Sequence, residues 1–226
     1  MRRGMDEKNN FIYLFVSLVS LLFSSFMMDQ FPGTSGEKIF FFISIAMFVV
    51  GIKSLHIGQT VKRAVYFMAA VASLLASGWF FYPGNMFIAY ALLLFELIFF
   101  AGAFKTAYGK ILFEGEIDNN KIIGSITLYL LLGLIWTVLY VILVLVYPDS
   151  FNGIDMQDRQ TIYSSLAYFS FVTLTTLGYG DISPANNIAR FLVIMEAIAG
   201  IFYLALIVSS IVSLRLAEIQ NRRNHE

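Results

Sequence analysis

The sequence predicts an all-α membrane protein, and three observations support this fold class. Of the 226 residues, 58% are hydrophobic and only 13% are charged, which leaves too few polar residues to cover a water-soluble domain. Apolar runs long enough to cross a bilayer recur along the chain. Basic residues gather between alternate runs, as they do in membrane proteins of fixed orientation. Because the chain has no cysteine, disulfides and thiolate metal sites are excluded.

Four predicted spans occupy residues 11–104. The second is the shortest, and it crosses a bilayer only if it continues to about Ile57. The fourth contains one ionisable residue, Glu96, and no arginine. A voltage sensor needs several arginines in such a span. We therefore do not expect this helix to sense the membrane voltage. The four runs are Phe11–Met28, Ile39–Ile52, Ala64–Tyr82 and Met86–Phe104.

Two longer apolar runs, Ile122–Tyr147 and Ile188–Leu216, complete a set of six transmembrane helices. Between the fourth and fifth spans, residues 105–121 mix charged and apolar side chains, which indicates a helix at the membrane interface that links the two units. Polar segments, residues 1–10 and 217–226, stand at the two ends. We therefore expect a four-span unit, an interfacial linker and a two-span unit.

The basic residues predict that both termini are cytoplasmic. In that orientation, twelve of the fifteen basic residues lie inside, and Lys38, Arg159 and Arg190 lie outside. The outside segments carry more acidic than basic residues, which raises the local cation concentration modestly. The net charge of zero gives no reason to expect a nucleic-acid partner.

A glycine-bearing segment, residues 173–184, separates the last two apolar runs. It reads Thr-Leu-Thr-Thr-Leu-Gly-Tyr-Gly-Asp-Ile-Ser-Pro. Irregular backbone is costly at bilayer depth unless it lines a water-filled path. Gly178 and Gly180 lack a Cβ and can adopt positive φ, so that successive carbonyls point the same way. A row of oxygens along one axis suits a dehydrated monovalent cation.

Residues 176–181, Thr-Leu-Gly-Tyr-Gly-Asp, resemble the signature sequence of tetrameric potassium channels, with leucine in place of the usual valine. The resemblance extends over roughly the C-terminal third of the chain. It implies a homotetramer in the lipid of the cell membrane. It also implies a pore domain over residues 122–216, with a re-entrant pore helix over Thr161–Thr175 that begins at a cap, Asp158, and leads into a selectivity filter.

The same resemblance implies which atoms bind potassium. Thr176 contributes its hydroxyl, and Leu177, Gly178, Tyr179 and Gly180 contribute backbone carbonyls, with K⁺ held at Thr176 to Tyr179. Leucine for valine preserves this chemistry, because that residue coordinates through its main chain. No cofactor other than potassium ions is implied.

Two aromatic residues of the pore helix, Tyr168 and Phe169, stand where many relatives have a tryptophan pair. The Tyr168 hydroxyl can donate a hydrogen bond to Asp181, whereas Phe169 has no donor for Tyr179. Tyr179 is expected to lie against Phe169 and Thr173, and the missing bond predicts a looser brace and closure at the filter itself. The residues assigned to filter support are Asp181, Tyr168, Phe169, Thr173 and Thr175.

The last span holds the gating candidates. Gly200 stands where relatives hinge their inner helix, and close packing against the pore helix explains it equally well. Leu204, Val208 and Val212, spaced by four, lie on one helical face and are candidates for the lining of an apolar cavity. Glu196 is an acid inside a span, for which structural support is favoured slightly over gating. The role of Glu96 stays open between the two.

A potassium-selective channel with weak voltage dependence is the favoured function, and three alternatives remain. A non-selective cation channel of this architecture often lacks the filter tyrosine, which is present here as Tyr179. A membrane enzyme built on Glu96 and Glu196 would lack an accompanying set of metal ligands. An accessory subunit without a pore is the third. Because residues 217–226 are too short for a ligand-binding domain, a regulator would be a separate subunit.

Overall fold

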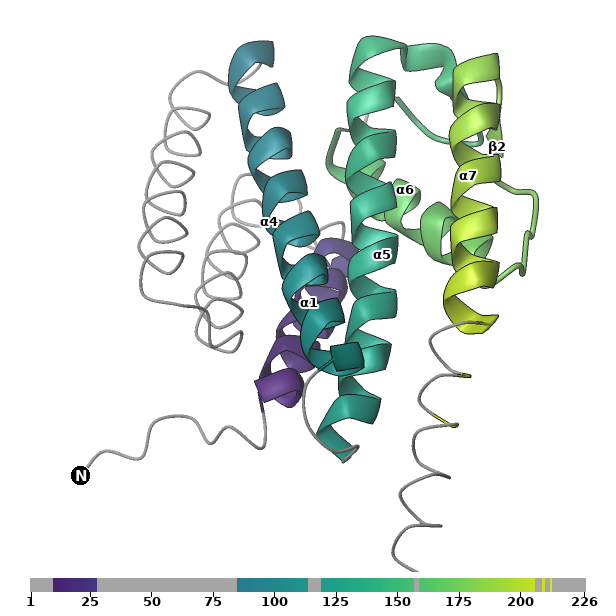
Figure 1. Ribbon diagram of the computed structural model, residues 1–226. Coiled ribbons are helices and arrows are strands. Elements are labelled where there is room, and N and C mark those ends of the chain that lie inside the picture. The colour runs from purple at the N-terminus through teal and green to yellow at the C-terminus, as the bar shows by residue number, and fades with distance from the viewer. Residues whose placement is uncertain are drawn as a thin grey trace, which may run out of the picture.

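The computed structural model describes residues 10–27, 85–113, 119–156, 159–205, 209 and 212 of the chain. The predicted second and third spans, the cap Asp158 and the cavity candidate Val208 lie outside these residues. Within them, helices dominate, and one antiparallel pair of two-residue strands accompanies them (Figure 1). The elements are α1 (Asn10–Met27), α4 (Met86–Phe113), α5 (Asn119–Val146), the 3-10 turn η3 (Pro148–Ser150), β1 (Phe151–Asn152), α6 (Arg159–Leu174), β2 (Ser183–Pro184) and α7 (Asn187–Tyr203).

Helix α4 is longer than the sequence predicts. It begins at Met86, as expected, but continues without a break to Phe113. Residues 105–113 of the predicted linker are therefore helical but continue α4 directly, and their position at the membrane interface stays a prediction. The reason is a continued apolar stripe: Ala107 and Ile111 are spaced by four and are both buried against Leu128 of α5. The domain boundary placed at 105 stays a prediction.

Two of the described helices, α4 and α5, are long and apolar enough to cross a membrane, judged by length and composition. Helix α4 has 28 residues, and at 1.5 Å per residue it is roughly 42 Å long, longer than the ~30 Å hydrocarbon core of a bilayer. Its two lysines, Lys105 and Lys110, therefore fall in its last third, where charge reaches the interface.

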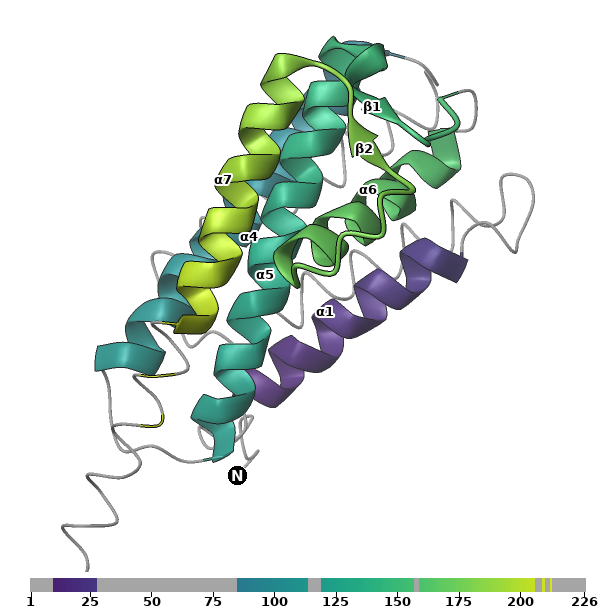
Figure 2. The same ribbon diagram turned by 90° about the vertical axis from the view of Figure 1, so that its right-hand side faces the viewer.

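One apolar cluster joins α1, α4 and α5. Its members recur at intervals of three and four along each helix, which places them on one face. They are Leu14, Leu18 and Leu21 of α1, Phe100 and Ala103 of α4, and Leu131, Leu134 and Val138 of α5. Helix α5 is thus the central element: α1, α4, α6 and α7 all contact it, and α1 also contacts α6 (Figures 1 and 2).

The segment that contains α6, between α5 and α7, starts and finishes at the same end of the molecule. Helix α6 begins near the end where α5 finishes and runs obliquely to about the middle of α5, where its last residue, Leu174, packs on Gly200 in the last turn of α7. The chain then turns back to β2 (Figure 2). Strands β1 and β2 pair antiparallel, with Phe151 opposite Pro184 and Asn152 opposite Ser183. This path is the re-entrant geometry that the sequence predicts for the segment between α5 and α7.

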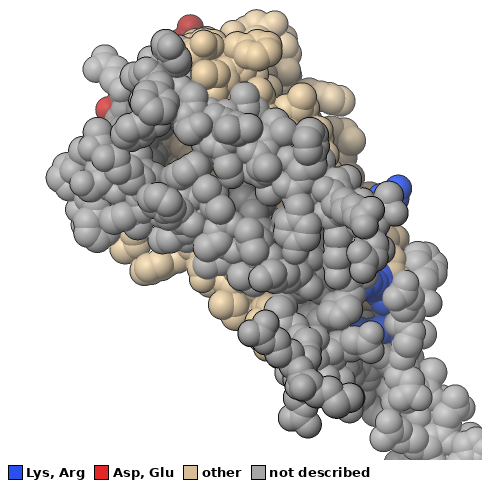
Figure 3. Space-filling model, turned by 90° about the vertical axis from the view of Figure 1, so that its left-hand side faces the viewer, with Lys and Arg blue, Asp and Glu red and all other residues tan. Residues whose placement is uncertain are grey.

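Most charged side chains on the described part of the surface separate by sign, and Arg190 at the start of α7 is the exception. On the face shown in Figure 3, acidic side chains stand at the upper end and basic ones toward the lower end. The lower end holds the last turns of α4, with Lys105 and Lys110, and the start of α5, where Lys121 is buried. The upper end holds the segment between α5 and α6, with Asp149 and Asp155.

Candidate functional site

The segment after α6 leaves the helix through a tight turn. The Thr176 amide donates to the Thr173 carbonyl at 3.0 Å, and the Leu177 amide donates to the Val172 carbonyl at 3.0 Å. We call residues 175–181 the ribbon. Its backbone has positive φ at Thr176 (60°), Gly178 (57°) and Gly180 (80°). The sign of φ therefore alternates along the ribbon, because Leu177 and Tyr179 between them do not have positive φ.

The two glycines adopt the positive φ that the sequence predicts, but Thr176 was not expected to. A β-branched residue at positive φ is an outlier that costs about 1–3 kcal/mol. The two turn hydrogen bonds hold it there. The alternation lets successive carbonyls of the ribbon face one side.

Every residue of the ribbon is exposed in the single chain. Leu177 is 55% exposed and Tyr179 66%, although both are large and apolar. Helix α7 also leaves an apolar stripe uncovered, at intervals of three to four: Phe191, Ile194, Ile198 and Ile201. Exposed apolar surface of this kind marks a contact with lipid or with another protein.

The outer end of the ribbon is tied to α6 by Tyr168. Its hydroxyl donates to Oδ2 of Asp181 at 2.7 Å, which is the hydrogen bond that the sequence predicts. The Tyr168 ring also stacks on Tyr179, with centroids 6.5 Å apart and planes 6° apart. The Ile182 amide donates to Oδ1 of the same carboxylate at 3.0 Å. The hydrogen bond from Tyr168, followed by that amide, lowers the pKa of Asp181 below its ordinary value.

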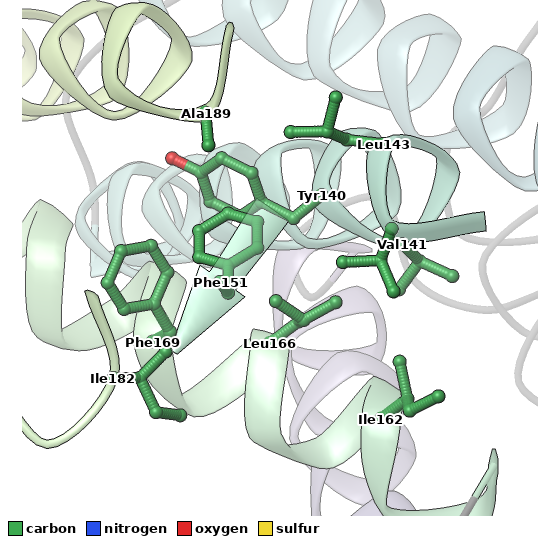
Figure 4. Close-up of a cluster of buried hydrophobic side chains, with 10 residues drawn as sticks. Tyr140, Val141, Leu143, Phe151, Ile162, Leu166, Phe169, Ile182 and Ala189 are labelled. Atoms are coloured by element: carbon green, nitrogen blue, oxygen red, sulfur yellow. The ribbon is translucent and has the colours of Figure 1, made fainter. Parts of the chain in front are cut away.

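Phe169 packs in the core between α5 and α6, and its expected contact with Tyr179 stays a prediction. It is buried, and its ring packs edge-on against Tyr140 of α5 at 5.5 Å and Phe151 of β1 at 5.2 Å. These three rings come together between α5 and α6 (Figure 4). Residue 169 points into this core because it lies about 100° around the helix from residue 168.

The two threonines assigned to filter support turn back on α6. The Thr175 hydroxyl donates to the Phe171 carbonyl at 2.7 Å. Thr173 is half-buried, and its carbonyl accepts the turn hydrogen bond from the Thr176 amide. Both residues thus help to end α6 at the point where the ribbon begins.

A buried polar cluster joins α5, α6 and α7. The Glu196 side chain is fully buried. Its Oε2 is hydrogen-bonded to the Tyr140 hydroxyl, and its Oε1 lies 2.5 Å from the Ser170 Oγ. The Ser170 Oγ also lies 2.9 Å from the Gly133 carbonyl. Sequence reasoning found Glu196 but missed Tyr140 and Ser170, and the only signal for them is that a buried acid needs partners.

Two glycines let α5 and α7 approach the end of α6. A Cβ on Gly200 would lie 2.8 Å from the Leu174 carbonyl oxygen, and one on Gly133 would lie 2.6 Å from the Phe171 ring. Helix α7 runs through Gly200, and the Leu204 amide donates to the carbonyls of Gly200 and Ile201. Of the two explanations for Gly200, close packing is therefore the one that the contacts support.

The remaining candidates are placed as follows. Leu204 and Val212 are exposed in the single chain, at 46% and 52%, and Val208 lies outside the described residues. Glu96 of α4 accepts a hydrogen bond from the Tyr163 hydroxyl of α6 at 2.7 Å. Glu96 therefore joins the fourth predicted span to the first turns of α6, a link that the sequence left open.

The segment beyond the ribbon is anchored by residues that sequence reasoning missed. The Ala185 amide donates to the Ser150 carbonyl at 2.8 Å, and the Asn186 side chain donates to the Ser150 hydroxyl at 2.9 Å. Asn186 also caps α7, because its Oδ1 accepts from the Ala189 amide at 2.8 Å. Gly153, at φ 85°, packs directly on the Asp181 carbonyl. The two ends of the re-entrant segment are thus held together.

Comparison with known proteins bears on the same part of the chain. The family described as "Ion channel" matches residues 126–215, which include most of α5, α6, the ribbon and α7. The chain is 32% identical over 91 residues to two-pore potassium channel 4 of Arabidopsis thaliana, a match that covers 34% of this chain and 31% of that protein. The chain thus spans less than a third of that relative. No solved structure matches it significantly.

The family match falls on the helical part of the chain that holds most of α5 and all of α6 and α7. The family match makes residues 126–215 similar to an ion channel domain, and the plant relative is itself a potassium channel. Together they point to a transport protein rather than an enzyme.

Proposed function

We propose that this chain is one subunit of a homotetrameric, potassium-selective channel that conducts K⁺ passively across the cell membrane. The observation that carries the proposal is the ribbon: an exposed, irregular segment with alternating sign of φ at Thr176, Gly178 and Gly180, placed at the end of α6. Four such ribbons around one axis would offer rings of oxygens that replace the hydration shell of a potassium ion. The atoms assigned to this task are the Thr176 hydroxyl and the carbonyls of residues 177–180.

Helix α6 would assist the ion electrostatically. Its C-terminal end, at Leu174, lies about midway along α5 and beside the last turn of α7 (Figure 2). The last carbonyls of a helix carry a partial negative charge, which favours a cation near them. In a bilayer this end would meet the ion where water is scarce and the attraction is screened least.

Tetramer formation accounts for the exposed apolar surface. The stripe on α7 and the side chains of Leu177 and Tyr179 have no cover in the single chain. A closed ring of four copies would bring each ribbon to the axis and bury part of this surface between neighbours. The remaining exposed apolar side chains would face lipid.

The membrane arrangement completes the proposal. We infer six spans with both termini cytoplasmic, an orientation that the separation of acidic and basic side chains supports. Within α4, the basic residues Lys105 and Lys110 lie in the last third. No gating charge is therefore available at the centre of this helix, and we propose weak intrinsic voltage dependence.

A recording from the purified protein in a planar bilayer tests the proposal. With potassium on one side and sodium on the other, the reversal potential is expected to lie close to the potassium equilibrium potential, and the conductance is expected to vary little along a voltage ramp. A Gly178→Ala variant is expected to lose selectivity or current, because alanine is strained at φ 57°. Gly102→Ala serves as the matched control, because a Cβ there meets no atom within 4 Å.

Three outcomes would contradict the proposal in different ways. A reversal potential near zero would indicate a non-selective cation channel of the same architecture. A steep conductance–voltage relation would contradict the weak voltage dependence alone. No current from a correctly assembled protein would indicate an accessory subunit.

A further inference from the structure

The cluster around Glu196 contains three short oxygen–oxygen contacts. The Tyr140 hydroxyl contacts Oε2 of Glu196, the Ser170 Oγ contacts Oε1 of Glu196 at 2.5 Å, and the Ser170 Oγ contacts the Gly133 carbonyl oxygen at 2.9 Å. Each contact needs one proton between its two oxygens to be a hydrogen bond. Tyr140 supplies one proton and Ser170 supplies one. The Gly133 carbonyl supplies none, so two protons are available for three contacts.

The third proton has one source within the cluster, which is the Glu196 carboxyl. If Glu196 is protonated, its Oε1 donates to the Ser170 Oγ, and the Ser170 hydroxyl is free to donate to the Gly133 carbonyl. The Tyr140 hydroxyl then donates to Oε2, and every contact is a hydrogen bond. If Glu196 is ionised, one of the two contacts of Ser170 has no proton and becomes a repulsion between two oxygens.

The surroundings of Glu196 also disfavour a charge. The carboxyl is fully buried, and the partners that the described part of the chain gives it are the hydroxyls of Tyr140 and Ser170. Neither of these is a cation. Burying an isolated carboxylate is expensive, whereas a neutral carboxyl with all its hydrogen bonds is tolerated.

The position of the cluster gives this proton a consequence for the ribbon. Ser170 lies four residues before Leu174, and Glu196 lies four residues before Gly200, which packs on Leu174. The two helices therefore meet in two successive contacts one turn apart, Ser170 with Glu196 and Leu174 with Gly200. The ribbon begins at the next residue, Thr175.

We infer that Glu196 carries a proton and is a positioning residue: it donates a hydrogen bond to Ser170 and so fixes the end of α6 from which the ribbon starts. The consequence for conduction rests on the proposed function, whereas the proton itself does not. The two parts are therefore tested by different measurements.

Infrared spectroscopy of the purified protein tests the proton. The difference spectrum between wild type and Glu196→Gln at neutral pH is expected to contain the C=O stretch of a protonated carboxylic acid. Glu96→Gln, which removes the acid of α4 that accepts from Tyr163, is the matched control and is expected to leave that stretch in place. A difference spectrum that shows only carboxylate bands would overturn the inference, whether or not the protein conducts.

Reversal potentials in mixed potassium and sodium test the positioning role. In Glu196→Gln the side-chain amide can donate to Ser170 and accept from Tyr140, so the permeability ratio is expected to stay within about twofold of wild type. Glu196→Leu and Ser170→Ala remove the hydrogen bond, and the ratio is expected to fall about tenfold. A glutamine variant as impaired as the leucine variant would show that a charge is required and would overturn the inference.

The Ser170→Ala variant keeps the test decisive if Glu196→Leu fails to fold. Ser170→Ala removes one hydroxyl and leaves the bond between Tyr140 and Glu196 intact, so it is expected to assemble even if Glu196→Leu does not. An unchanged permeability ratio in Ser170→Ala would overturn the positioning role. A wild-type protein that carries the protonated carboxyl but no current would contradict the proposed function and leave the proton established.

Discussion

Asp181 is the last residue of the ribbon. The pKa of its carboxyl depends on a hydrogen bond from the Tyr168 hydroxyl. The hydrogen bond from Tyr168 lowers the pKa of Asp181. The stabilisation that this hydrogen bond gives the folded chain is therefore fully present at pH values above the ordinary pKa of an aspartate. This stabilisation is lost as the pH falls through the lowered pKa that Asp181 has in the folded chain. The contact therefore persists at neutral pH and fails only in acid.

Removing this hydroxyl makes the outer end of the ribbon more sensitive to acid. In Tyr168→Phe the pKa of Asp181 is expected to rise toward its ordinary value, because its largest stabilising contact is gone. An NMR titration of the Asp181 carboxyl measures this. Tyr13→Phe, on the exposed face of α1, is the control and is expected to change nothing. An unchanged pKa in Tyr168→Phe would show that the hydrogen bond does not form.

Gly200 and Gly102 offer a matched pair of glycine-to-alanine substitutions. Gly200→Ala is expected to destabilise the protein by about 1–3 kcal/mol, because its Cβ would lie 2.8 Å from the Leu174 carbonyl oxygen. Gly102→Ala, with no atom within 4 Å, is expected to be neutral or slightly stabilising. Melting temperatures in detergent measure both. Equal effects would favour a hinge at Gly200 over close packing.

At the scale of elements, α6 and the two ends of the ribbon are held in place by several neighbours. Helix α5 approaches through Gly133 and α7 through Gly200, while Tyr168 ties the helix to the ribbon's outer end. The pair β1–β2 then joins the segments before and after the re-entrant helix. The strained Thr176 persists because the turn hydrogen bonds to the end of α6 fix it.

The contact between Gly153 and the Asp181 carbonyl is the tightest point of this arrangement. Gly153→Ala is expected to lower stability by about 1–3 kcal/mol, because the residue has φ 85° and its Cβ would overlap that carbonyl oxygen. Asn152→Ala, one residue earlier on β1 and exposed, is the control and is expected to cost less than about 0.5 kcal/mol. Thermal unfolding of both variants, followed by circular dichroism, distinguishes them.

The helices could largely be predicted from the sequence, whereas the contacts between them could not. The apolar runs at 11–28 and 122–147 correspond to α1 and α5 within one to three residues, because span length and composition are local signals. The cluster of Tyr140, Ser170 and Glu196 joins residues 26 and 56 positions apart, and no local pattern indicates such a pairing. The end of α4 was missed because its buried stripe continues past the first lysine.

At the ribbon, local chemistry was again the better guide. Positive φ at Gly178 and Gly180 followed from the absence of a Cβ, and the bond between Tyr168 and Asp181 followed from the resemblance. Positive φ at Thr176 is imposed by the turn that ends α6. The inward direction of Phe169 depends on Tyr140 and Phe151, which lie far away in the sequence.

For the whole molecule, the account requires that the exposed stripe of α7 is covered by another copy. Ile194 of α7 is 57% exposed and Leu94 of α4 is 55% exposed, so glutamine at either position makes an equal change in polarity. Ile194→Gln is expected to reduce the tetramer fraction in native mass spectrometry, because it places an amide in a subunit contact. Leu94→Gln is expected to leave the tetramer intact. The reverse result would place the subunit contact on α4.

The central claim is that four ribbons surround one axis and present oxygens to potassium. Cryo-electron microscopy of the protein in lipid nanodiscs with potassium tests it most directly. We expect fourfold symmetry, with residues 176–180 of each copy lining the axis and a row of ion densities between them. A monomer, or a tetramer whose ribbons face away from the axis, would contradict the account.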